Sequence, residues 1–362
     1  MKMKNFKTAF VTFFPVVPDN MGSSAVINSR FNSWPMKKKL FQLSHIKNIN
    51  NKSIKTVILK KEKPLNKIFS LPKVIIEIFK YLKNSKKKIL VVEGASWIFY
   101  SFIVVFSFKI LFSKLKIIYI SHSIESEIRK KFSNIFIYII TKYLEKLVFK
   151  KSDIVTSVSK IEKNKIKKIY NQKTILFPNS INLNNIIKIK KIKSDYIIYS
   201  GSYLYKPNKQ AIDYLNHIIM PSLIKKFPGL KLILTGGGFK KKYPWLINKN
   251  IVSKQELYTL MCNSICMCVP LKFGSGTRIK IIEALSLGSI VVSSKKGIEG
   301  IELLNKKPPY VFNNTKNFLE ILVNVIKNNK KIKKKAYKDR NYYLNKYSMK
   351  KNTYIFLKKI NL

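Results

Sequence analysis

The stretch from Pro270 to Ser294 holds the residues of this chain that are best suited to bind an anion. Its sequence, PLKFGSGTRIKIIEALSLGSIVVSS, reads as a loop, a helix and a buried strand. Gly274 and Gly276 let the loop backbone come close to a ligand, and Thr277 is expected to cap the helix that follows. Because a helix N-terminus carries unpaired N–H groups and a partial positive charge, this pattern predicts an anion site at the loop.

Three charged side chains of the same helix support a ligand site. Arg278 and Lys280 stand in its first turn, where a positive charge costs roughly 0.3 to 1 kcal/mol against the helix dipole unless a polyanion is bound. Glu283 follows Gly276 by about two turns, within the apolar run IIEAL. A carboxylate among apolar residues is costly without a polar partner, and a ligand would supply one. A surface helix whose charges face water is the alternative interpretation.

The same stretch resembles the donor-binding domain of retaining glycosyltransferases of family 4, which have the GT-B architecture. Relatives share P-L-x-x-G-x-G-T-[RK]-x-K-x-x-E-A, and the segment Pro270–Ala284 matches every fixed position. The resemblance implies that Glu283 binds the ribose hydroxyls of a nucleotide sugar. Ser275 stands where the broader family has a second Glu, so its backbone N–H would have to replace a carboxylate contact to the sugar. The donor-binding residues implied in this stretch are Gly274, Ser275, Gly276, Thr277, Arg278, Lys280 and Glu283.

Two more candidate residues follow expected strands of the N-terminal half. Gly22 comes after a strand at Lys7–Phe14, and in the resembled family the glycine of this loop approaches the donor phosphates. His122 follows a strand at Lys116–Ile120, at the sheet edge where open α/β folds bind ligands. A lone His is more often structural. With Glu125 it forms H-x-x-E, which resembles the family's H-N-x-E segment and implies that His122 lies near the transferred sugar as the catalytic residue.

The C-terminal half begins with a second motif of the resembled family. The segment Tyr196–Asn208 is similar to F-x-G-x-x-x-Y-x-P-N, with Gly201 at the end of the expected strand. Family members grip the diphosphate with an Arg and a Lys after this strand. Ser202 replaces the Arg here, so the resemblance leaves Lys206 as the diphosphate contact, helped by Arg278. The alternative is that Lys206 is one lysine among very many.

The length of 362 residues favours two domains. We expect an α/β fold of the GT-B type, with two Rossmann-like doubly wound domains that face a central cleft. Residues 1–190 would form an acceptor-side domain, and residues 196–335 a nucleotide-sugar-binding domain, with Lys188–Asp195 as a basic linker. Residues 336–362 would form a C-terminal helical segment, of which Met349–Ile360 crosses back onto the first domain, as in GT-B proteins.

The charge of the chain is strongly positive: 71 Lys+Arg against 17 Asp+Glu give a formal net charge of +54. Such a field favours polyanionic partners, although biased codon usage would also explain it. The uncharged run Trp97–Phe108 is too short to span a membrane, which takes about 20 residues, and predicts a core-packed helix with a membrane-facing side.

The cysteines and the N-terminus indicate a reduced, intracellular protein. Cys262, Cys266 and Cys268 lack a second cluster or a nearby His and are expected to be small core residues rather than zinc ligands. The apolar run Thr8–Phe14 is short and followed by prolines, so no signal peptide is expected.

These observations predict a metal-independent, retaining glycosyltransferase without a cofactor. Its substrate would be a nucleotide sugar, UDP- or GDP-linked, and its acceptor a cell-envelope glycan, a lipopolysaccharide or a lipid-linked sugar. It would work in the cytoplasm, peripherally on the anionic inner face of the membrane, without binding a specific nucleic acid. A sugar-nucleotide-binding protein without catalysis and a basic nucleic-acid-binding protein are the alternatives.

Overall fold

A computed structural model describes residues 6–17, 22–45, 51–182, 195–274, 276–304 and 310–362. The chain divides into two compact units. The first comprises Met1–Asn182 together with Met349–Leu362, and the second Leu183–Ser348. Each unit contains one parallel sheet.

The first unit is built on a sheet with strand order β3-β2-β1-β4-β5-β6-β7, all pairs parallel. Apolar runs make its central strands: Ala9, Val91 and Ile118 are wholly buried. The order changes direction between β1 and β4, as in a doubly wound fold. The strands are β1 Phe6–Thr12, β2 Lys37–Ser44, β3 Ile54–Ile58, β4 Lys87–Gly94, β5 Leu115–Ser121, β6 Ile154–Ser157 and β7 Ile175–Leu176.

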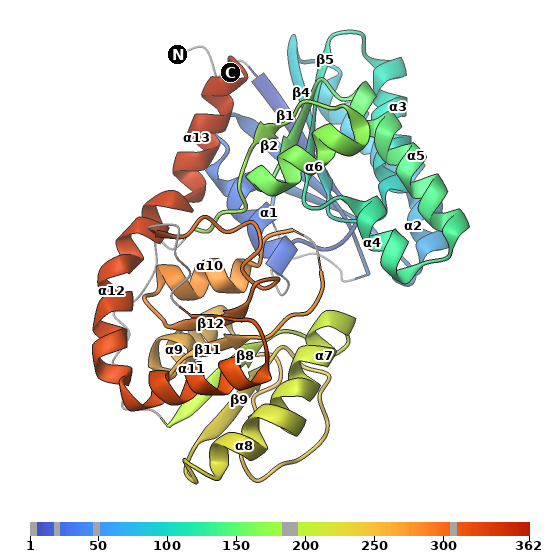
Figure 1. Cartoon of the computed structure of the whole chain (residues 1–362). Helices are drawn as coiled ribbons and strands as arrows, with labels where there is room; N and C mark the ends of the chain where they lie inside the picture. The colour runs from blue at the N-terminus through green and yellow to red at the C-terminus, as the bar shows by residue number, and fades with distance from the viewer. Residues whose placement is uncertain (1–5, 18–21, 46–50, 183–194, 275, 305–309) are drawn as a thin grey trace. The chain divides into compact units, whose positions relative to one another are not determined.

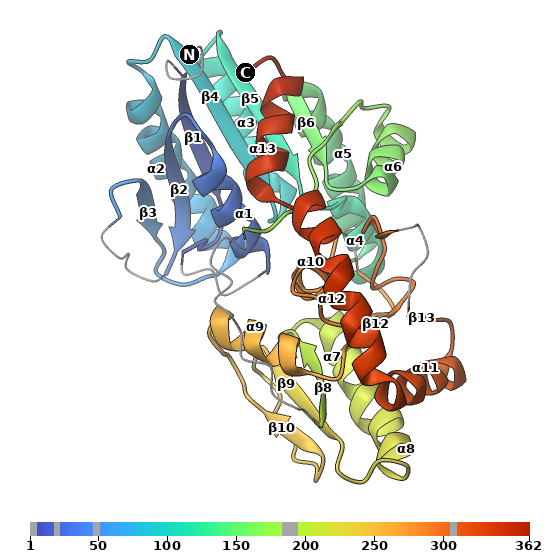
Figure 2. The ribbon, with the colours of Figure 1, turned by 90° about the vertical axis from the view of Figure 1, so that its left-hand side faces the viewer.

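Helices cover both faces of this sheet (Figures 1 and 2). On one face α1 packs against α13, and on the other α3 packs between α2 and α5. The expected apolar helix is α3, and its residues up to Phe108 are buried or half-buried against the sheet. The helices are α1 Gly22–Ser33, α2 Pro64–Leu82, α3 Ile98–Leu111, α4 Glu125–Phe132, α5 Ile135–Lys151, α6 Lys160–Tyr170 and α13 Met349–Lys359.

The last helix, α13, is part of the first unit although it ends the sequence. Phe356 stacks on Phe177 with ring centroids 4.5 Å apart. Asn352 donates from Nδ2 to Ser180 Oγ at 2.8 Å, and the Met349 N–H donates to the Ile181 carbonyl at 3.0 Å. The segment after β7 and the last helix therefore stabilise each other.

The second unit has a parallel sheet with strand order β10-β9-β8-β11-β12-β13. Its centre is buried and contains Cys266 and Cys268, which are both wholly buried free thiols, while Cys262 is half-buried. The strands are β8 Tyr196–Ser200, β9 Lys231–Thr235, β10 Leu246–Asn248, β11 Met267–Val269, β12 Val291–Ser294 and β13 Val311–Phe312.

The starts of two helices in the second unit bear on the site. The helix after β8 begins at Lys206, because Pro207 is well placed in a first helical turn, and a π-helical turn at Leu215–Ile219 continues it. The helix after the glycine loop begins at Ile279 with Arg278 as its N-cap residue, so Thr277 is not the cap. The helices are α7 Lys206–Tyr214, α8 Met220–Ile224, α9 Lys254–Asn263, α10 Ile279–Ser286, α11 Thr315–Lys327 and α12 Asn329–Lys346.

Within the residues that the structure describes, no helix combines the length and the apolar character needed to cross a membrane.

Candidate functional site

The first unit holds His122 directly after β5, at the carboxyl edge of its sheet. His122 is only 9% exposed, and its Nε2 lies 2.6 Å from Glu93 Oε2. Glu93 is the next-to-last residue of the neighbouring strand β4 and accepts from Arg30 Nη1, at 2.8 Å on Oε1 and 2.6 Å on Oε2. Arg30 belongs to the last turn of α1. A buried chain of three side chains therefore fixes the imidazole.

Arg30 and Glu93 are opposite charges that compensate each other in the interior. Arg30 and Glu93 are both wholly buried. Burial opposes the ionisation of Glu93, but the charges and hydrogen bonds of Arg30 and His122 outweigh it and lower the pKa of the carboxyl. The guanidinium of Arg30 also lies over the Phe177 ring, 4.8 Å from its centroid. Glu93 is thus an anion that orients His122. A histidine at a reaction centre needs such an orienting partner.

A second buried carboxylate holds the turn that follows His122. Glu145 of α5 accepts from the backbone N–H groups of Glu125 and Ser126, at 2.8 and 3.2 Å, and from the Tyr170 hydroxyl at 2.5 Å. It thereby serves the unpaired donors at the start of α4, where the N-cap residue Ile124 has no capping side chain. Burial raises the pKa of Glu145 and raises that of Glu125 to about 7.

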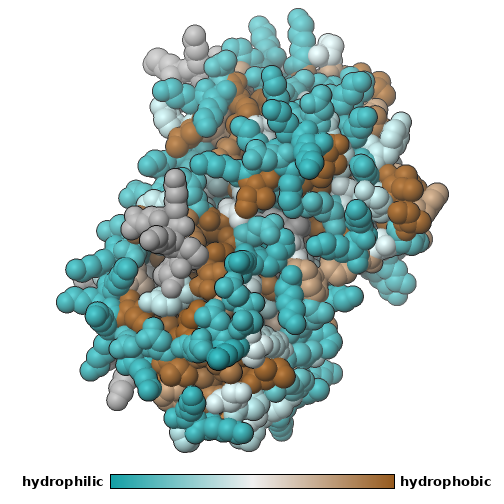
Figure 3. All heavy atoms as spheres, viewed as in Figure 1, coloured by the Kyte–Doolittle hydropathy of each residue, from teal (hydrophilic) through white to brown (hydrophobic). Residues whose placement is uncertain are grey.

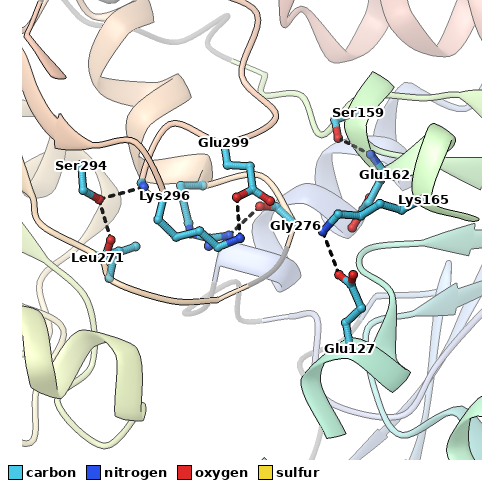
Figure 4. Close-up of polar contacts among 11 residues, drawn as sticks. Glu127, Ser159, Glu162, Lys165, Leu271, Gly276, Ser294, Lys296 and Glu299 are labelled. Carbon is cyan, nitrogen blue, oxygen red and sulfur yellow. Dashed lines mark hydrogen bonds and ion pairs between the residues drawn. The ribbon is translucent and has the colours of Figure 1, made fainter. Parts of the chain in front are cut away.

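The start of α6 is fixed by two hydrogen bonds. Ser159 Oγ accepts from the Glu162 N–H at 3.1 Å, as Figure 4 shows. The Glu162 carboxylate accepts from the Val158 N–H at 3.3 Å. Lys165 forms an ion pair with Glu127 of α4 at 3.0 Å. These contacts join α4 and α6 beside the His122 turn.

Gly22 is the first residue of α1 and is exposed. The start of this helix is tied to the end of the β1 segment, because Ser24 Oγ donates to the Pro15 carbonyl at 2.9 Å. Its contact with donor phosphates stays a prediction.

In the second unit, the glycine loop after β11 folds around the side chain of Arg278. Arg278 Nη1 donates to the Gly276 carbonyl at 2.5 Å. Gly274 has φ +129°, a conformation that side-chain-bearing residues rarely adopt, so the loop needs a glycine there. Figure 4 shows how the loop is anchored: Ser294 at the end of β12 donates to the Leu271 carbonyl at 2.5 Å. Ser275 lies outside the described residues.

Lys280 connects the glycine loop to the neighbouring strand β8. Its Nζ donates to the Ser200 carbonyl at 2.5 Å, approaches Asn208 Oδ1 at 3.4 Å, and lies 4.3 Å from the centroid of the Tyr199 ring. Burial, and secondarily the charge of Arg278, lower the pKa of Lys280 to about 7. Near neutral pH, the Lys280 amine is therefore close to losing its proton. An anion that binds beside it stabilises the protonated, charged form.

Glu283 is 6% exposed on α10 and is held from α9. The Tyr258 hydroxyl donates to its Oε1 at 2.9 Å, and Lys254 Nζ lies 3.8 Å from the same oxygen. The carboxylate therefore sits at the junction of two helices, with a hydroxyl and an ammonium supplied by α9.

Gly201 follows β8, and Lys206 is the first residue of α7. Gly201 has φ +153° and packs against Asn208, whose side chain would lie 2.7 Å from an added Cβ. Asn208 accepts from the Tyr199 hydroxyl at 2.7 Å and donates to the Ser202 carbonyl at 3.0 Å. Lys206 is exposed. The structure thus brings Gly201, Lys280 and the glycine loop to one edge of the second sheet.

Several residues of these sites escaped the sequence analysis. Glu93 belongs to no motif, and Arg30 lies far from it in the sequence. Asn208 belongs to the P-N motif, but nothing in the sequence identifies Lys280 as its partner. Tyr258 and Lys254 carry no motif at all. Among the described ranges, no three His, Cys, Asp or Glu side chains gather in a way that could hold a metal ion.

Residues 194–328 match the family model described as glycosyl transferases group 1. This segment contains the whole glycine loop and α10. The segment is therefore similar to a glycosyl transferases group 1 domain, in agreement with the resemblance to glycosyltransferases found in the sequence. A search of curated proteins gave no match to the chain.

Solved structures agree with this assignment at the level of the fold. HepE of Anabaena, crystallised with UDP and glucose, has a TM-score of 0.72 at 11% identity, over 98% of this chain and 99% of that one. The N-terminal domain of Candida albicans trehalose-6-phosphate phosphatase has a TM-score of 0.69 at 11% identity, over 99% and 96%. WaaG, a glycosyltransferase involved in lipopolysaccharide biosynthesis, has a TM-score of 0.62 at 12% identity, over 95% and 97%. The α/β class and the GT-B fold are confirmed.

Proposed function

We propose that this chain, which carries a glycosyl transferases group 1 domain, is a retaining glycosyltransferase that transfers a sugar from a nucleotide sugar to a cell-envelope acceptor. The observation that carries the proposal is the glycine loop with α10 within the matched segment: Arg278 is the N-cap residue, Lys280 lies in the first turn, and Glu283 is buried one turn further on. Helix termini of this kind bind phosphate groups.

Each part of the donor has a proposed partner in the second unit. The diphosphate binds at the loop and the start of α10, close to Arg278 and Lys280, with Lys206 and Gly201 after β8 as further contacts. Glu283 accepts hydrogen bonds from the ribose hydroxyls. We favour UDP over GDP because UDP is bound in the HepE structures. For Ser275, the resemblance implies a contact of its backbone N–H with the sugar.

The departing diphosphate needs neutralisation, and this chain can supply it from cations and backbone dipoles. Arg278 and Lys280 provide the charges, and the N-terminus of α10 provides its N–H groups. In the first unit, His122 faces the transferred sugar in our proposal and is held for this task by Glu93. The acceptor is a lipid-linked sugar, a lipopolysaccharide or another envelope glycan at the inner face of the membrane, where the net charge of +54 favours an anionic surface.

A thermal-shift screen of nucleotide sugars tests this function. A ligand at 100 times its Kd should add about 2.7 kcal/mol to the stability of the domain that binds it. We expect one UDP- or GDP-sugar to raise the melting temperature and its bare sugar to have no effect. A panel without any stabilising nucleotide sugar, combined with stabilisation by DNA at physiological salt, would contradict the proposal and favour a nucleic-acid-binding protein.

Transfer should not require a metal ion and should retain the anomeric configuration of the donor. Both expectations follow from the resemblance to family 4 enzymes. Activity with the best donor should be the same with and without excess EDTA, and an NMR spectrum of the early product should show the donor's anomer. Loss of activity on chelation, restored by a divalent cation, would contradict metal independence. The opposite anomer would exclude the retaining mechanism.

Donor binding should weaken as the pH rises above 7, because Lys280 has a pKa of about 7 in the free protein. A bound diphosphate raises this pKa, so binding takes up a proton at higher pH. Between pH 7 and 9 the Kd should increase by up to about tenfold per pH unit. Calorimetry with a nucleotide sugar, whose diphosphate does not titrate in this range, measures the change.

Two variants make the pH experiment specific. Lys280→Met should bind weakly and without this pH dependence. Lys272→Met, which removes an exposed lysine of the same loop, should keep the pH dependence of the wild type. An identical pH profile for wild type and Lys280→Met would show that Lys280 does not contact the donor.

A further inference from the structure

The outward face of α5 is apolar over its first turns. Phe136, Ile139, Ile140 and Tyr143 follow the i, i+3, i+4, i+7 pattern of one helix face and are 68, 56, 36 and 62% exposed. Ile135 beside them is 69% exposed, and Phe132 at the end of α4 is 42% exposed. We call these six side chains the α5 patch: Phe132, Ile135, Phe136, Ile139, Ile140 and Tyr143.

The α5 patch is not needed to hold the helix on the unit. A second stripe with the same spacing, formed by Thr141, Leu144, Glu145 and Val148, is buried and packs inward. The helix therefore has an inner face that serves the core and a separate outer face of large apolar side chains. Figure 3 shows apolar surface at the right-hand edge of the molecule, where Figure 1 draws α5. Contiguous exposed apolar surface of this kind marks an interaction site.

The exposed charges around the α5 patch are predominantly positive. The exposed lysines on α4 and α5 are Lys130, Lys131, Lys142, Lys146, Lys150 and Lys151, and Glu127 in the first turn of α4 is paired with Lys165. From residue 128 to residue 152 the only acidic residue is Glu145, and its side chain is buried. The patch is thus an apolar surface with a cationic rim, which complements a surface that is apolar inside and anionic outside.

The α5 patch lies near one edge of the first sheet. The helix starts at the carboxyl edge of the first sheet and returns to the other edge, because it connects the parallel strands β5 and β6. The apolar side chains occupy its first half, and Lys146 and Lys150 follow toward its end. His122 lies at the same carboxyl edge. A surface that binds the patch therefore lies near the carboxyl edge of the sheet, where His122 is also located.

We propose that the α5 patch inserts into the interfacial region of an anionic bilayer, with the lysines of α4 and α5 on the headgroups. The patch replaces the membrane-facing side expected on Trp97–Phe108, whose residues are buried or half-buried. The role of this docking in delivering a lipid-linked acceptor rests on the proposed function, whereas the docking itself does not. A second copy of the chain is a poorer occupant, because two molecules of charge +54 would bring their lysine rims together.

Co-sedimentation of the full chain with vesicles tests the docking surface. The probes are vesicles of phosphatidylcholine alone and vesicles with added phosphatidylglycerol. The wild type should bind the anionic vesicles and be released by high salt, as the Debye length falls from about 10 Å at 0.1 M to about 3 Å at 1 M. The triple variant Ile135→Ser, Phe136→Ser, Ile139→Ser should bind the anionic vesicles roughly 30-fold more weakly or worse.

A matched control removes an exposed apolar side chain at the other edge of the sheet. Ile110 lies in the last turn of α3 and is 83% exposed, and Ile110→Ser should bind vesicles like the wild type. Thermal unfolding without vesicles should be the same for all three proteins, because the substituted side chains are exposed. Nucleotide-sugar binding in solution should also be the same, which separates failure of the docking surface from failure of the proposed function.

Two outcomes would overturn the inference. In the first, the triple variant binds anionic vesicles as tightly as the wild type. In the second, the wild type is a dimer that the triple variant dissociates, while vesicle binding is unchanged, so that the patch is an interface between copies.

Discussion

Replacing Glu93 by leucine should destabilise the first unit by about 3 to 5 kcal/mol, because the Arg30 guanidinium would stay buried without a counter-charge. Arg30 and Glu93 are both wholly buried, and Arg30 Nη1 contacts both carboxylate oxygens. The carboxyl has a lowered pKa, so its contribution to stability is present at neutral pH and is lost as the pH falls through that value. Denaturant unfolding followed by Trp34 and Trp97 fluorescence measures the loss.

Two controls separate the buried charge from general damage to the unit. Glu77→Ala breaks the partly exposed pair with Lys55, 3.4 Å long, and should cost less than about 1 kcal/mol. The double variant Arg30→Met, Glu93→Leu should recover most of the lost stability, since no unpaired charge remains. A Glu93→Leu protein as stable as the wild type would show that the pair is not important for folding.

Replacing Glu283 by glutamine should weaken binding of the best nucleotide sugar by about 1.5 to 3 kcal/mol, which is the value of a hydrogen bond to a charged group. In affinity this is roughly 10-fold to 150-fold. The proposed cause is the loss of the anion that accepts from the ribose hydroxyls. Calorimetric titration measures the Kd, and the melting temperature without ligand should change little, because the amide still accepts from Tyr258.

Variants on α9 test whether the effect belongs to the ribose contact. Glu256→Gln removes a half-exposed carboxylate of α9 and should leave the Kd unchanged. Tyr258→Phe removes the hydroxyl that holds Glu283 and should weaken binding less than Glu283→Gln does. Unchanged affinity in Glu283→Gln would remove this residue from the donor site.

The glycine loop and α10 could be predicted because their signals are local. Glycines, a first helical turn and an amphipathic stripe lie next to one another in the sequence, and Gly288, at φ +75°, follows the end of the helix. The cap was wrong by one residue, because Thr277 and Arg278 both stand at the boundary and the sequence does not say which one leaves the helix.

Contacts between distant segments could not be predicted. The Arg30–Glu93–His122 chain joins α1, β4 and β5, and no local pattern relates these three positions. Strands β2 and β3 were not predicted, since the lysines of KKKLFQLS hide an apolar run, and α2 was missed, in part because Pro72 lies inside it. The exposed apolar face of α5 has the same residue spacing as a helix face that packs in a core. The exposure of its side chains in the structure distinguishes it from a core-packing face.

The membership of α13 in the first unit has a consequence for the order in which the chain becomes stable during synthesis. A ribosome synthesises β1 to β7 long before the residues of α13. Trp34 and Phe177 both pack against Phe356, so these contacts form only after α13 has been made. Arg30 is covered by Phe177 and therefore depends on the same late event. The second unit, Leu183–Ser348, is complete in sequence before the first one is. Although domains generally mature from the N-terminus onward, the unit that holds His122 is expected to be the last part of this protein to acquire its native packing.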